Sequence, residues 1–224
     1  MEEPNSVDQQ TSMFNKTYPV LTKEVGEKLL TTAYIYGEIQ EPHAFIELIA
    51  ILDNAEEGDE VTLKVSSGGG FLAGALALCD AIERTKALVV GECIGENASA
   101  ATILLLSCDD LVVTSWGSFM IHAYSSGYYG KRAEVRSALV FELDQLEHMF
   151  NEIYTPFLSE DECKQVLNKS EDIYLNKEQI EERWKLVQEL RYNNLQESVA
   201  LNMEAQKDAE VQQAREILAK YNIE

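Results

Sequence analysis

The sequence predicts an α/β fold in which strand–helix–strand units repeat and helices pack against a parallel sheet. Two observations lead to this prediction. Apolar residues alternate over VTLKVSS (61–67) but recur at helical spacing over AFIELIAILDNA (44–55). Strand-like and helix-like segments then follow one another from 61 to 116 with short turns between them. This order is typical of parallel strands joined by crossover helices.

The first elements follow from composition and turn signals. AYIYGEI (33–39) is rich in aromatic and β-branched residues and ends at the turn Glu41-Pro42, so we expect a strand there. The helix at 44–55 presents Phe45, Leu48 and Leu52 on one side. The turn EEGDE then leads into the strand at 61–67.

The central elements are more apolar. FLAGALALCDAIERT (71–85) combines small and apolar residues and predicts a helix, and KALVVGECI (86–94) predicts a buried strand. ASAATILLLSC (98–108) predicts a second apolar helix. DLVVTSW (110–116) predicts a further strand, closely followed by GSFMIHAY (117–124).

The last third of the chain is expected to be helical. Residues 133–156 form a long amphipathic pattern, and a shorter helix is predicted from Asp161 to Asn168. From about 178 the chain is highly charged with sparse apolar residues, which indicates either a solvated helical extension or a partner-binding helix pair. We therefore divide the chain into a flexible polar arm (1–20), a globular domain (21–187) and a charged helical C-terminal extension (188–224).

Composition bounds the function. The chain has 224 residues, 46% of them hydrophobic, which is ordinary for a globular protein. Its 39 acidic and 18 basic residues give a formal net charge of −21. Such a chain repels phosphate, so neither nucleic acid nor an anionic membrane is an expected partner. The acidity indicates a solvated surface or, alternatively, attraction of basic substrates or partners.

Cysteine usage and the N-terminal segment indicate a soluble intracellular protein. The four cysteines form no C-x-x-C pair, so buried free thiols are expected rather than a metal or redox site. The segment MEEPNSVDQQ has neither the basic nor the apolar region of a signal peptide. The most apolar stretch contains Glu92, Glu96 and Asn97, which makes it a poor membrane span.

Three features could carry chemistry. Gly68-Gly69-Gly70 follows a strand and opens a helix, where backbone N–H groups can bind an oxyanion, although a plain tight turn explains the glycines equally well. Ser99 lies among small residues between a buried strand and a helix, as a nucleophile or an N-cap would. His122 ends an apolar run before a Ser/Gly-rich loop, where catalytic and structural histidines both occur.

Four segments, taken together, favour the chemical interpretation. SSGGGFLAG (66–74), GENASAA (95–101), SFMIHAYSSGYYG (118–130) and SEDIYLNKEQ (170–179) resemble, in order and spacing, the Clp protease proteolytic subunit family of self-compartmentalising serine peptidases. The resemblance runs from about residue 33 to residue 187. It implies a ClpP/crotonase-like fold of repeated β-α-β units with a protruding strand-helix handle, here followed by the helical extension.

The resemblance also implies roles for individual residues. Ser99 matches the family nucleophile, His122 its general base and Asp172 the third member of the triad. The backbone N–H groups of the oxyanion hole would come from Gly68 and Gly69 and from Ala100. Gly127, Tyr128 and Gly130 would line the substrate groove, because they lie in the stretch that resembles the start of the family's handle region.

Partners follow from the same resemblance. The substrates would be polypeptides, cleaved without a metal or cofactor. The chain would form a homo-oligomeric ring of six or seven copies, with stacking of rings and an ATP-dependent unfoldase as further features of the family. The expected location is the cytoplasm, that of the host if this divergent chain is phage-encoded.

The sequence departs from the family pattern at three places, which leaves alternatives open. Val65-Ser66-Ser67 replaces the usual Asn-Ser-Pro, Ala123-Tyr124 replaces Gln-Pro, and Glu171 replaces an arginine that helps to lock rings together. The alternatives are a catalytically silent scaffold or assembly subunit, a crotonase-type acyl-CoA enzyme, and a Ser-Lys hydrolase with Lys86 or Lys131 as base.

Overall fold

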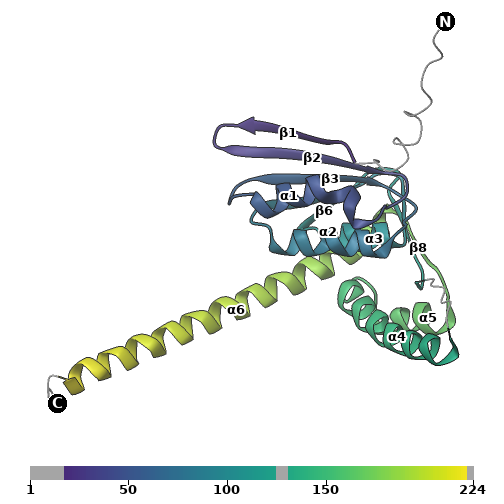
Figure 1. The fold of residues 1–224 in the computed structure, drawn as a ribbon. Helices are drawn as coiled ribbons and strands as arrows, with labels where there is room; N and C mark the ends of the chain where they lie inside the picture. The colour runs from purple at the N-terminus through teal and green to yellow at the C-terminus, as the bar shows by residue number, and fades with distance from the viewer. Residues whose placement is uncertain (1–17, 125–130, 221–224) are drawn as a thin grey trace, which may run out of the picture.

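The structure is a computed structural model that describes residues 18–124 and 131–220, and it contains two sheets and a set of helices (Figure 1). The strands are β1 (Val20–Val25), β2 (Lys28–Tyr36), β3 (Glu60–Ser66), β4 (Leu88–Cys93), β5 (Glu96–Ala98), β6 (Asp110–Val113), β7 (Ser118–Ile121) and β8 (Ile173–Leu175). The helices are η2 (Pro42–Phe45), α1 (Ile46–Asn54), α2 (Leu72–Arg84), α3 (Ala100–Ser107), α4 (Arg132–Tyr154), α5 (Glu160–Lys169) and α6 (Lys177–Lys220).

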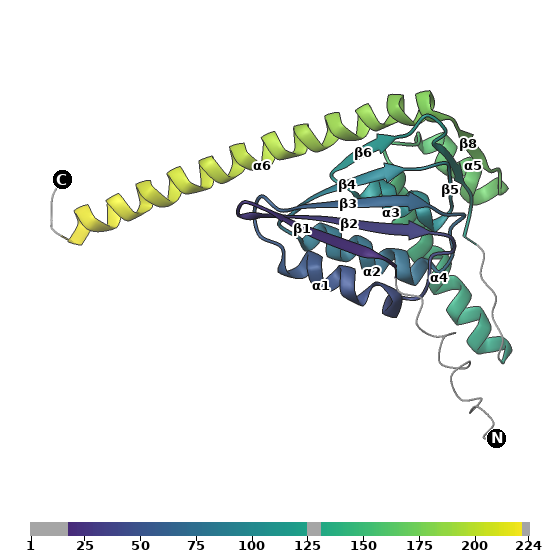
Figure 2. The same cartoon turned by 90° about the horizontal axis from the view of Figure 1, so that it is seen from above.

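The larger sheet has the strand order β1-β2-β3-β4-β6, visible from above in Figure 2. Strands β2, β3, β4 and β6 are parallel, and each successive pair is connected through a helix. Strand β1 pairs antiparallel with β2 across a two-residue turn at Gly26-Glu27. The predicted α/β class with a parallel sheet is therefore confirmed.

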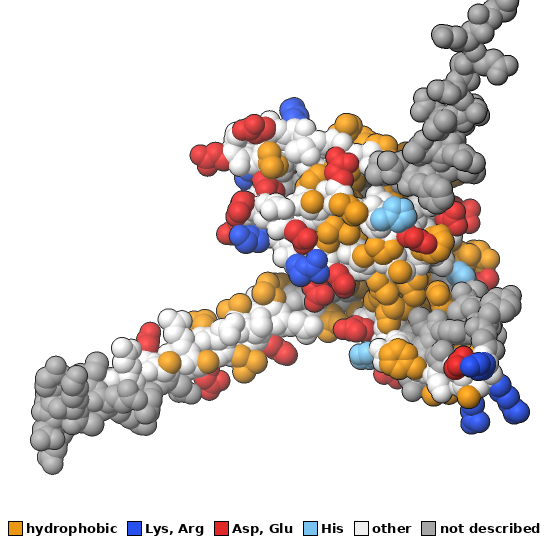
Figure 3. All heavy atoms as spheres, in the orientation of Figure 1, with side chains coloured by type: hydrophobic (Ala, Val, Ile, Leu, Met, Phe, Trp, Pro, Cys, Tyr) orange, Lys and Arg blue, Asp and Glu red, His pale blue; other side chains and the backbone are white. Residues whose placement is uncertain are grey.

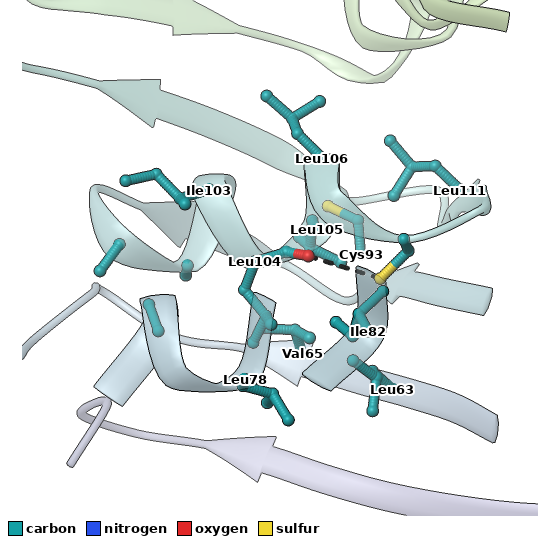
Figure 4. Close-up of a cluster of buried hydrophobic side chains, with 14 of the residues drawn as sticks. Leu63, Val65, Leu78, Ile82, Cys93, Ile103, Leu104, Leu105, Leu106 and Leu111 are labelled. Carbon is teal, nitrogen blue, oxygen red and sulfur yellow. Dashed lines mark hydrogen bonds between the residues drawn. The ribbon is translucent and has the colours of Figure 1, made fainter. Parts of the chain in front are cut away.

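The main core lies between this sheet and the helices α1, α2 and α3, which cover one of its faces (Figures 1 and 2). Figure 4 shows Leu63 and Val65 of β3 facing Leu78 of α2 across this layer. All residues from Ala100 to Leu106 are buried, so α3 is covered on every side. Each fully buried large side chain contributes about 1.5–3 kcal/mol, which fixes α3 firmly beneath the sheet.

The smaller sheet has the order β5-β7-β8 and lies where the strands of the larger sheet end. Strand β5 follows β4 after only Ile94 and Gly95. The N–H of Ile94 donates to the carbonyl of Val65, and the N–H of Ala98 donates to Ser67. The small sheet is thereby attached to the carboxyl end of the large one, the edge at which α/β proteins usually bind ligands.

Helix α4 projects from the body, and it contacts the rest of the domain mainly through its C-terminal end (Figure 1). Its middle turns are exposed, with Phe141 68% accessible, whereas Phe150 and Tyr154 are buried. Helix α4 is thus the helical part of the protruding handle. Figure 3 shows apolar side chains gathered where α4 meets the helices beneath the sheet.

Helix α6 is a single helix of 44 residues, so the alternative of a C-terminal helix pair is wrong. Ile180, Trp184 and Val187 are buried against the domain. The Arg191 guanidinium lies 5.0 Å from the centre of the Trp184 ring and donates to the carbonyls of Leu106 (2.8 Å) and Cys108 (2.6 Å) at the end of α3. Beyond Arg191 every described side chain is exposed, and the helix runs free of the body (Figures 1 and 2).

Three strands were not predicted from the sequence, β1, β5 and β8, and β2 begins at Lys28 rather than at residue 33. The predicted arm, residues 1–20, lies outside the described residues except for its last three. Of these, Tyr18 stacks on Phe45 with ring centroids 4.7 Å apart, and Val20 begins β1. Among the described residues, no helix is both long and apolar enough to cross a membrane.

Candidate active site

Ser99 occupies a strained turn between β5 and α3. Its backbone has φ 55° and ψ −128°, a region that non-glycine residues rarely adopt and that costs about 1–3 kcal/mol. The turn is held on both sides: the Ser99 N–H donates to the Met120 carbonyl at 2.9 Å, and the Ser99 carbonyl accepts the Thr102 N–H at 2.9 Å. A half-buried hydroxyl is thus presented at the N-terminus of a buried helix, whose dipole favours developing negative charge.

The strand pairing brings His122 and Asp172 to the same end of the small sheet. Ala98 of β5 is paired with Met120 of β7, so Ser99 and His122 follow neighbouring strands. Ile121 is paired with Ile173 of the antiparallel strand β8, and one further step in this register places His122 opposite Asp172. Three residues from distant parts of the sequence therefore converge at one edge.

Continued one residue past the paired part of the strands, the alternation of side chains would put His122 and Asp172 on a common face. Ile121 is buried in the core, while Met120 and Tyr174 are on the opposite face of the small sheet. His122 is two residues from Met120 and Asp172 is two residues from Tyr174, so both would belong to that opposite face. Within the described part of the chain, no hydrogen bond joins the side chains of Ser99, His122 and Asp172. Before substrate binds, catalytic hydrogen bonds are often long and become short only in the complex.

The glycine-rich loop between β3 and α2 packs directly against the Ser99 turn. Gly69 has φ +96°, and a Cβ added there would lie 2.7 Å from the Cβ of Ser99 and 3.3 Å from the N of Ala100. The loop is fixed from the other side, because the Gly69 carbonyl accepts the N–H of Ile39 at 2.8 Å. Only glycine allows this approach of the two backbones.

The predicted oxyanion donors lie in these two segments. Gly69 and Ala100 are adjacent across the contact just described, whereas Gly68 is exposed and a Cβ on it would meet no atom within 4 Å. In this structure the Gly69 N–H donates to Ser67 Oγ at 3.1 Å. Gly69 would therefore bind an oxyanion only after the Ser67 hydroxyl turns aside.

Asn97 is a site residue that sequence reasoning missed. Its side chain is fully buried; Oδ1 accepts the N–H of Ser67 at 3.2 Å, and Nδ2 contacts the carbonyls of Ile94 and Gly95, each at 3.4 Å. It therefore ties the glycine-rich loop to the turn before Ser99. Two signals pointed to it: an amide within an apolar stretch, and Ser67, which supplies an N–H where the family has proline.

Neither Cys93, close to the Ser99 turn, nor Cys79, beside Ser107 at the other end of α3, competes with Ser99 as a nucleophile. Cys93 lies 3.3 Å from Asn97 Nδ2, but burial raises the pKa of its thiol to about 11. Burial likewise raises the pKa of Cys79 to about 11. Both thiols stay protonated at neutral pH, and the thiolate is the reactive form. The prediction of buried free thiols is confirmed for Cys93, Cys108 and Cys163, whereas Cys79 is partly exposed.

The two lysines considered as alternative bases are poorly placed for that role. Lys86 precedes β4 and therefore lies at the amino end of the sheet, while Ser99 lies beyond its carboxyl end. Its ammonium pairs with Glu56 at 3.2 Å. The Lys131 side chain is 88% exposed and pairs with Glu134, and a lysine acts as a base only when its ammonium is desolvated.

The predicted groove residues lie outside the described part of the chain; they are Gly127, Tyr128 and Gly130.

Comparison with known families agrees with this geometry. The model of the Clp protease family matches residues 21–189, a range that contains the glycine-rich loop, the Ser99 turn and both strands that carry His122 and Asp172. The chain therefore belongs to the Clp protease family. The resemblance noted from four short segments is confirmed, and membership supports a Clp-type peptidase in general terms.

Proposed function

We propose that this chain is a serine endopeptidase that cleaves polypeptides by means of Ser99, His122 and Asp172. The observation that carries the proposal is the strained Ser99 turn. It holds a hydroxyl at the N-terminus of α3, against the glycine-rich loop and beside two strands, one of which ends just before His122 and the other of which begins just after Asp172. A turn of this strain is retained in proteins mainly where function requires it.

The reaction follows from the chemistry of these groups. His122 takes the proton of the Ser99 hydroxyl as the oxygen attacks a peptide carbonyl, and Asp172 orients the imidazole. The tetrahedral intermediate collapses to an acyl-enzyme as His122 donates its proton to the leaving amine. Water, activated by His122, then releases the second peptide and restores Ser99.

Backbone N–H groups would stabilise the oxyanion. The Ala100 N–H at the start of α3 and the N–H of Gly69 belong to the two segments that meet at Ser99, and Gly68 precedes Gly69 in the chain. Each well-placed donor accelerates the step by about 10²–10³. Rotation of Ser67 away from Gly69 would accompany productive binding, and an extended substrate would bind by strand addition.

We further propose that the chain acts as a closed ring of six or seven copies supplied with substrate by an ATP-dependent unfoldase. Rings are typical of the family to which the chain belongs. The chemistry above uses only side chains and backbone groups of this chain. A cytoplasmic location accords with this proposal.

The nucleophile is tested with a fluorophosphonate probe and mass spectrometry of the adduct. The expected adduct is on Ser99, absent from Ser99→Ala and formed at least about a hundredfold more slowly in His122→Ala, because the general base is lost. His148→Ala is the matched control, since that histidine is exposed on α4 and lies 3.8 Å from Glu152. Labelling at another residue would overturn the triad.

The absence of hydrogen bonds among the three side chains favours one second candidate, a catalytically silent assembly subunit. A silent subunit would keep its fold and assemble, yet neither take up the probe on Ser99 nor hydrolyse unstructured polypeptides. The same labelling experiment, done on the assembled protein, therefore separates the two functions.

A further inference from the structure

We propose that Thr102 and Tyr154 are positioning residues of the nucleophile, forming a buried hydrogen-bonded relay that ends on the carbonyl of Ser99. This inference rests on the proposed function, because it assigns a role in setting the geometry of the Ser99 turn. Neither residue belongs to the four segments that carry the family resemblance: Thr102 follows the segment that ends at residue 101, and Tyr154 lies between the third and the fourth segment.

The relay consists of two short hydrogen bonds. Thr102 Oγ1 lies 2.7 Å from the Ser99 carbonyl oxygen and 2.6 Å from the hydroxyl of Tyr154. The direction of the bonds follows from proton count. A carbonyl oxygen only accepts, so the single hydroxyl proton of Thr102 points to Ser99 and the Tyr154 hydroxyl donates to Thr102.

The relay is enclosed by the core. Thr102 is fully buried in α3, and Tyr154, the last residue of α4, is 2% exposed. The Tyr154 ring packs on Phe150 with ring centroids 4.4 Å apart, which fixes the direction of its hydroxyl. Burial raises the pKa of Tyr154, so the phenol stays protonated and keeps its role as donor throughout the neutral range.

The relay acts on the strained part of the backbone. The Ser99 carbonyl accepts both the N–H and the hydroxyl of Thr102, and the direction of that carbonyl is set by ψ of Ser99. Threonine hydroxyls in helices often bond the carbonyl three or four residues earlier, but here the acceptor is the strained residue and the hydroxyl is also held by Tyr154. The second bond therefore opposes relaxation of Ser99 to an unstrained conformation that would move Oγ away from His122 and the oxyanion donors.

This position also links two elements that are distant in sequence. Tyr154 is separated from Thr102 by 52 residues and belongs to the helix that forms the handle. Ser99 geometry thus depends on the last turn of α4 being seated in the core. Among the described residues, Tyr154 forms its side-chain hydrogen bond with Thr102 and none with Ser99, His122 or Asp172, so its effect would pass through Thr102.

The test uses the full chain in three variants: Thr102→Val, which removes the relay hydroxyl, Tyr154→Phe, which keeps the ring, and Thr102→Ser, which keeps the hydroxyl. We expect kcat and the rate of fluorophosphonate labelling at Ser99 to fall about three- to tenfold in Tyr154→Phe and further in Thr102→Val, with KM nearly unchanged. Thr102→Ser, which keeps the hydroxyl, should retain most of the labelling rate and kcat of the unmodified chain.

Thr85→Val is the matched control. Thr85 makes the same kind of hydrogen bond, from Oγ1 to the Leu52 carbonyl at 2.6 Å, but far from the site between α1 and α2. The Thr85→Val variant should have a lower free energy of unfolding than the unmodified chain but the same rate of labelling at Ser99. In the relay, the double variant Thr102→Val/Tyr154→Phe should be no slower than Thr102→Val alone, because both changes interrupt one path.

The outcomes separate this inference from the proposed function. If Ser99 is not labelled in the unmodified chain, the proposed function fails. If Ser99 is labelled but Tyr154→Phe reacts as fast as Thr85→Val, or if the double variant shows purely additive losses, the relay is overturned while the proposed function stands. Should Thr102→Val fail to fold, Tyr154→Phe and Thr102→Ser decide the result.

Discussion

At the scale of single residues, the site depends on two backbone positions with positive φ that lie against each other. Gly69 has φ +96° and Ser99 has φ 55°. The first is tolerated because glycine has no Cβ, and the second because three hydrogen bonds, one to Met120 and two from Thr102, hold the Ser99 backbone. The loop and the nucleophile turn can therefore adopt their contact only together.

Gly69→Ala is expected to destroy this contact. The new Cβ would lie 2.7 Å from Ser99 Cβ at a φ that L-residues avoid, so we expect a loss of at least about 2 kcal/mol in the free energy of unfolding and loss of labelling at Ser99. Gly68→Ala, where a Cβ meets no atom within 4 Å, should change the unfolding free energy by less than about 0.5 kcal/mol. Equal stability of the two variants, measured by urea titration, would contradict this account.

The candidate triad could be named from the sequence, whereas its supporting residues were not, although two sequence signals pointed to Asn97. Ser99, His122 and Asp172 lie in segments with recognisable order and spacing. Asn97, Thr102 and Tyr154 act through contacts made only in three dimensions, over 30 residues for Asn97 and Ser67 and 52 for Thr102 and Tyr154. Their residue types alone are equally typical of caps and core positions.

At the scale of elements, a charged pair fastens α5 to α6. Arg183 of α6 donates two hydrogen bonds to Glu162 of α5, at 2.9 and 2.7 Å, and a third to the Phe157 carbonyl. Glu162 also completes the capping box with Ser159 at the start of α5. The Arg183 guanidinium, by hydrogen bonding, lowers the pKa of Glu162 to about 2. This pair stabilises the segment that leads into β8 and hence Asp172.

Glu162→Gln should lower the free energy of unfolding by about 2 kcal/mol at pH 7, because it removes the charge from the bidentate hydrogen bond between Arg183 and Glu162. The depressed pKa means that the stabilisation is complete above about pH 4.5 and is lost as the pH falls towards 2. The variant should therefore lose less stability than the unmodified chain between pH 5 and pH 2, a difference that urea titrations at both pH values would measure.

Glu160→Gln is the matched control for this experiment. Glu160 lies on the same helix but is 85% exposed and pairs with Lys164 at 3.7 Å. Exposed pairs contribute about 0–1 kcal/mol, so little change is expected at either pH. If Glu162→Gln follows the control, the pair does not stabilise the fold.

Most elements were predicted because their burial leaves a period in the sequence. Strand β3 alternates from Glu60 to Ser66, and helix α2 carries its small and apolar residues on the sheet side. Strand β1 shows no such period, because it lies at the sheet edge with all residues after Val20 exposed. Strand β8 has only three residues, too few for a period. The helix pair was wrong because no glycine or proline interrupts α6.

At the scale of the whole molecule, charge opposes self-association. Each copy carries a formal net charge of −21, so a ring concentrates like charge in a small volume. The exposed apolar side chains of α4, among them Leu139, Val140 and Phe141, would have to compensate for this repulsion in an assembly. Screening by salt should therefore favour the ring.

Mass measurement of the full chain at two salt concentrations tests this. Raising salt from about 0.1 to 1 M shortens the screening length from about 10 to 3 Å, so the fraction in rings of six or seven should rise. Sucrose at equal osmolarity is the control, because it changes excluded volume without screening charge. A monomer that persists at both salt concentrations would contradict the ring proposal.

Helix α6 also determines how the molecule would move in solution. At about 1.5 Å per residue its 44 residues span about 66 Å, and the part beyond Arg191 lies free of the domain. A particle with such a projection experiences more friction than a sphere of 25.2 kDa, so a monomer would sediment slowly and elute early from a sizing column. Elution volume would therefore overestimate the number of copies, and subunit number has to come from mass itself.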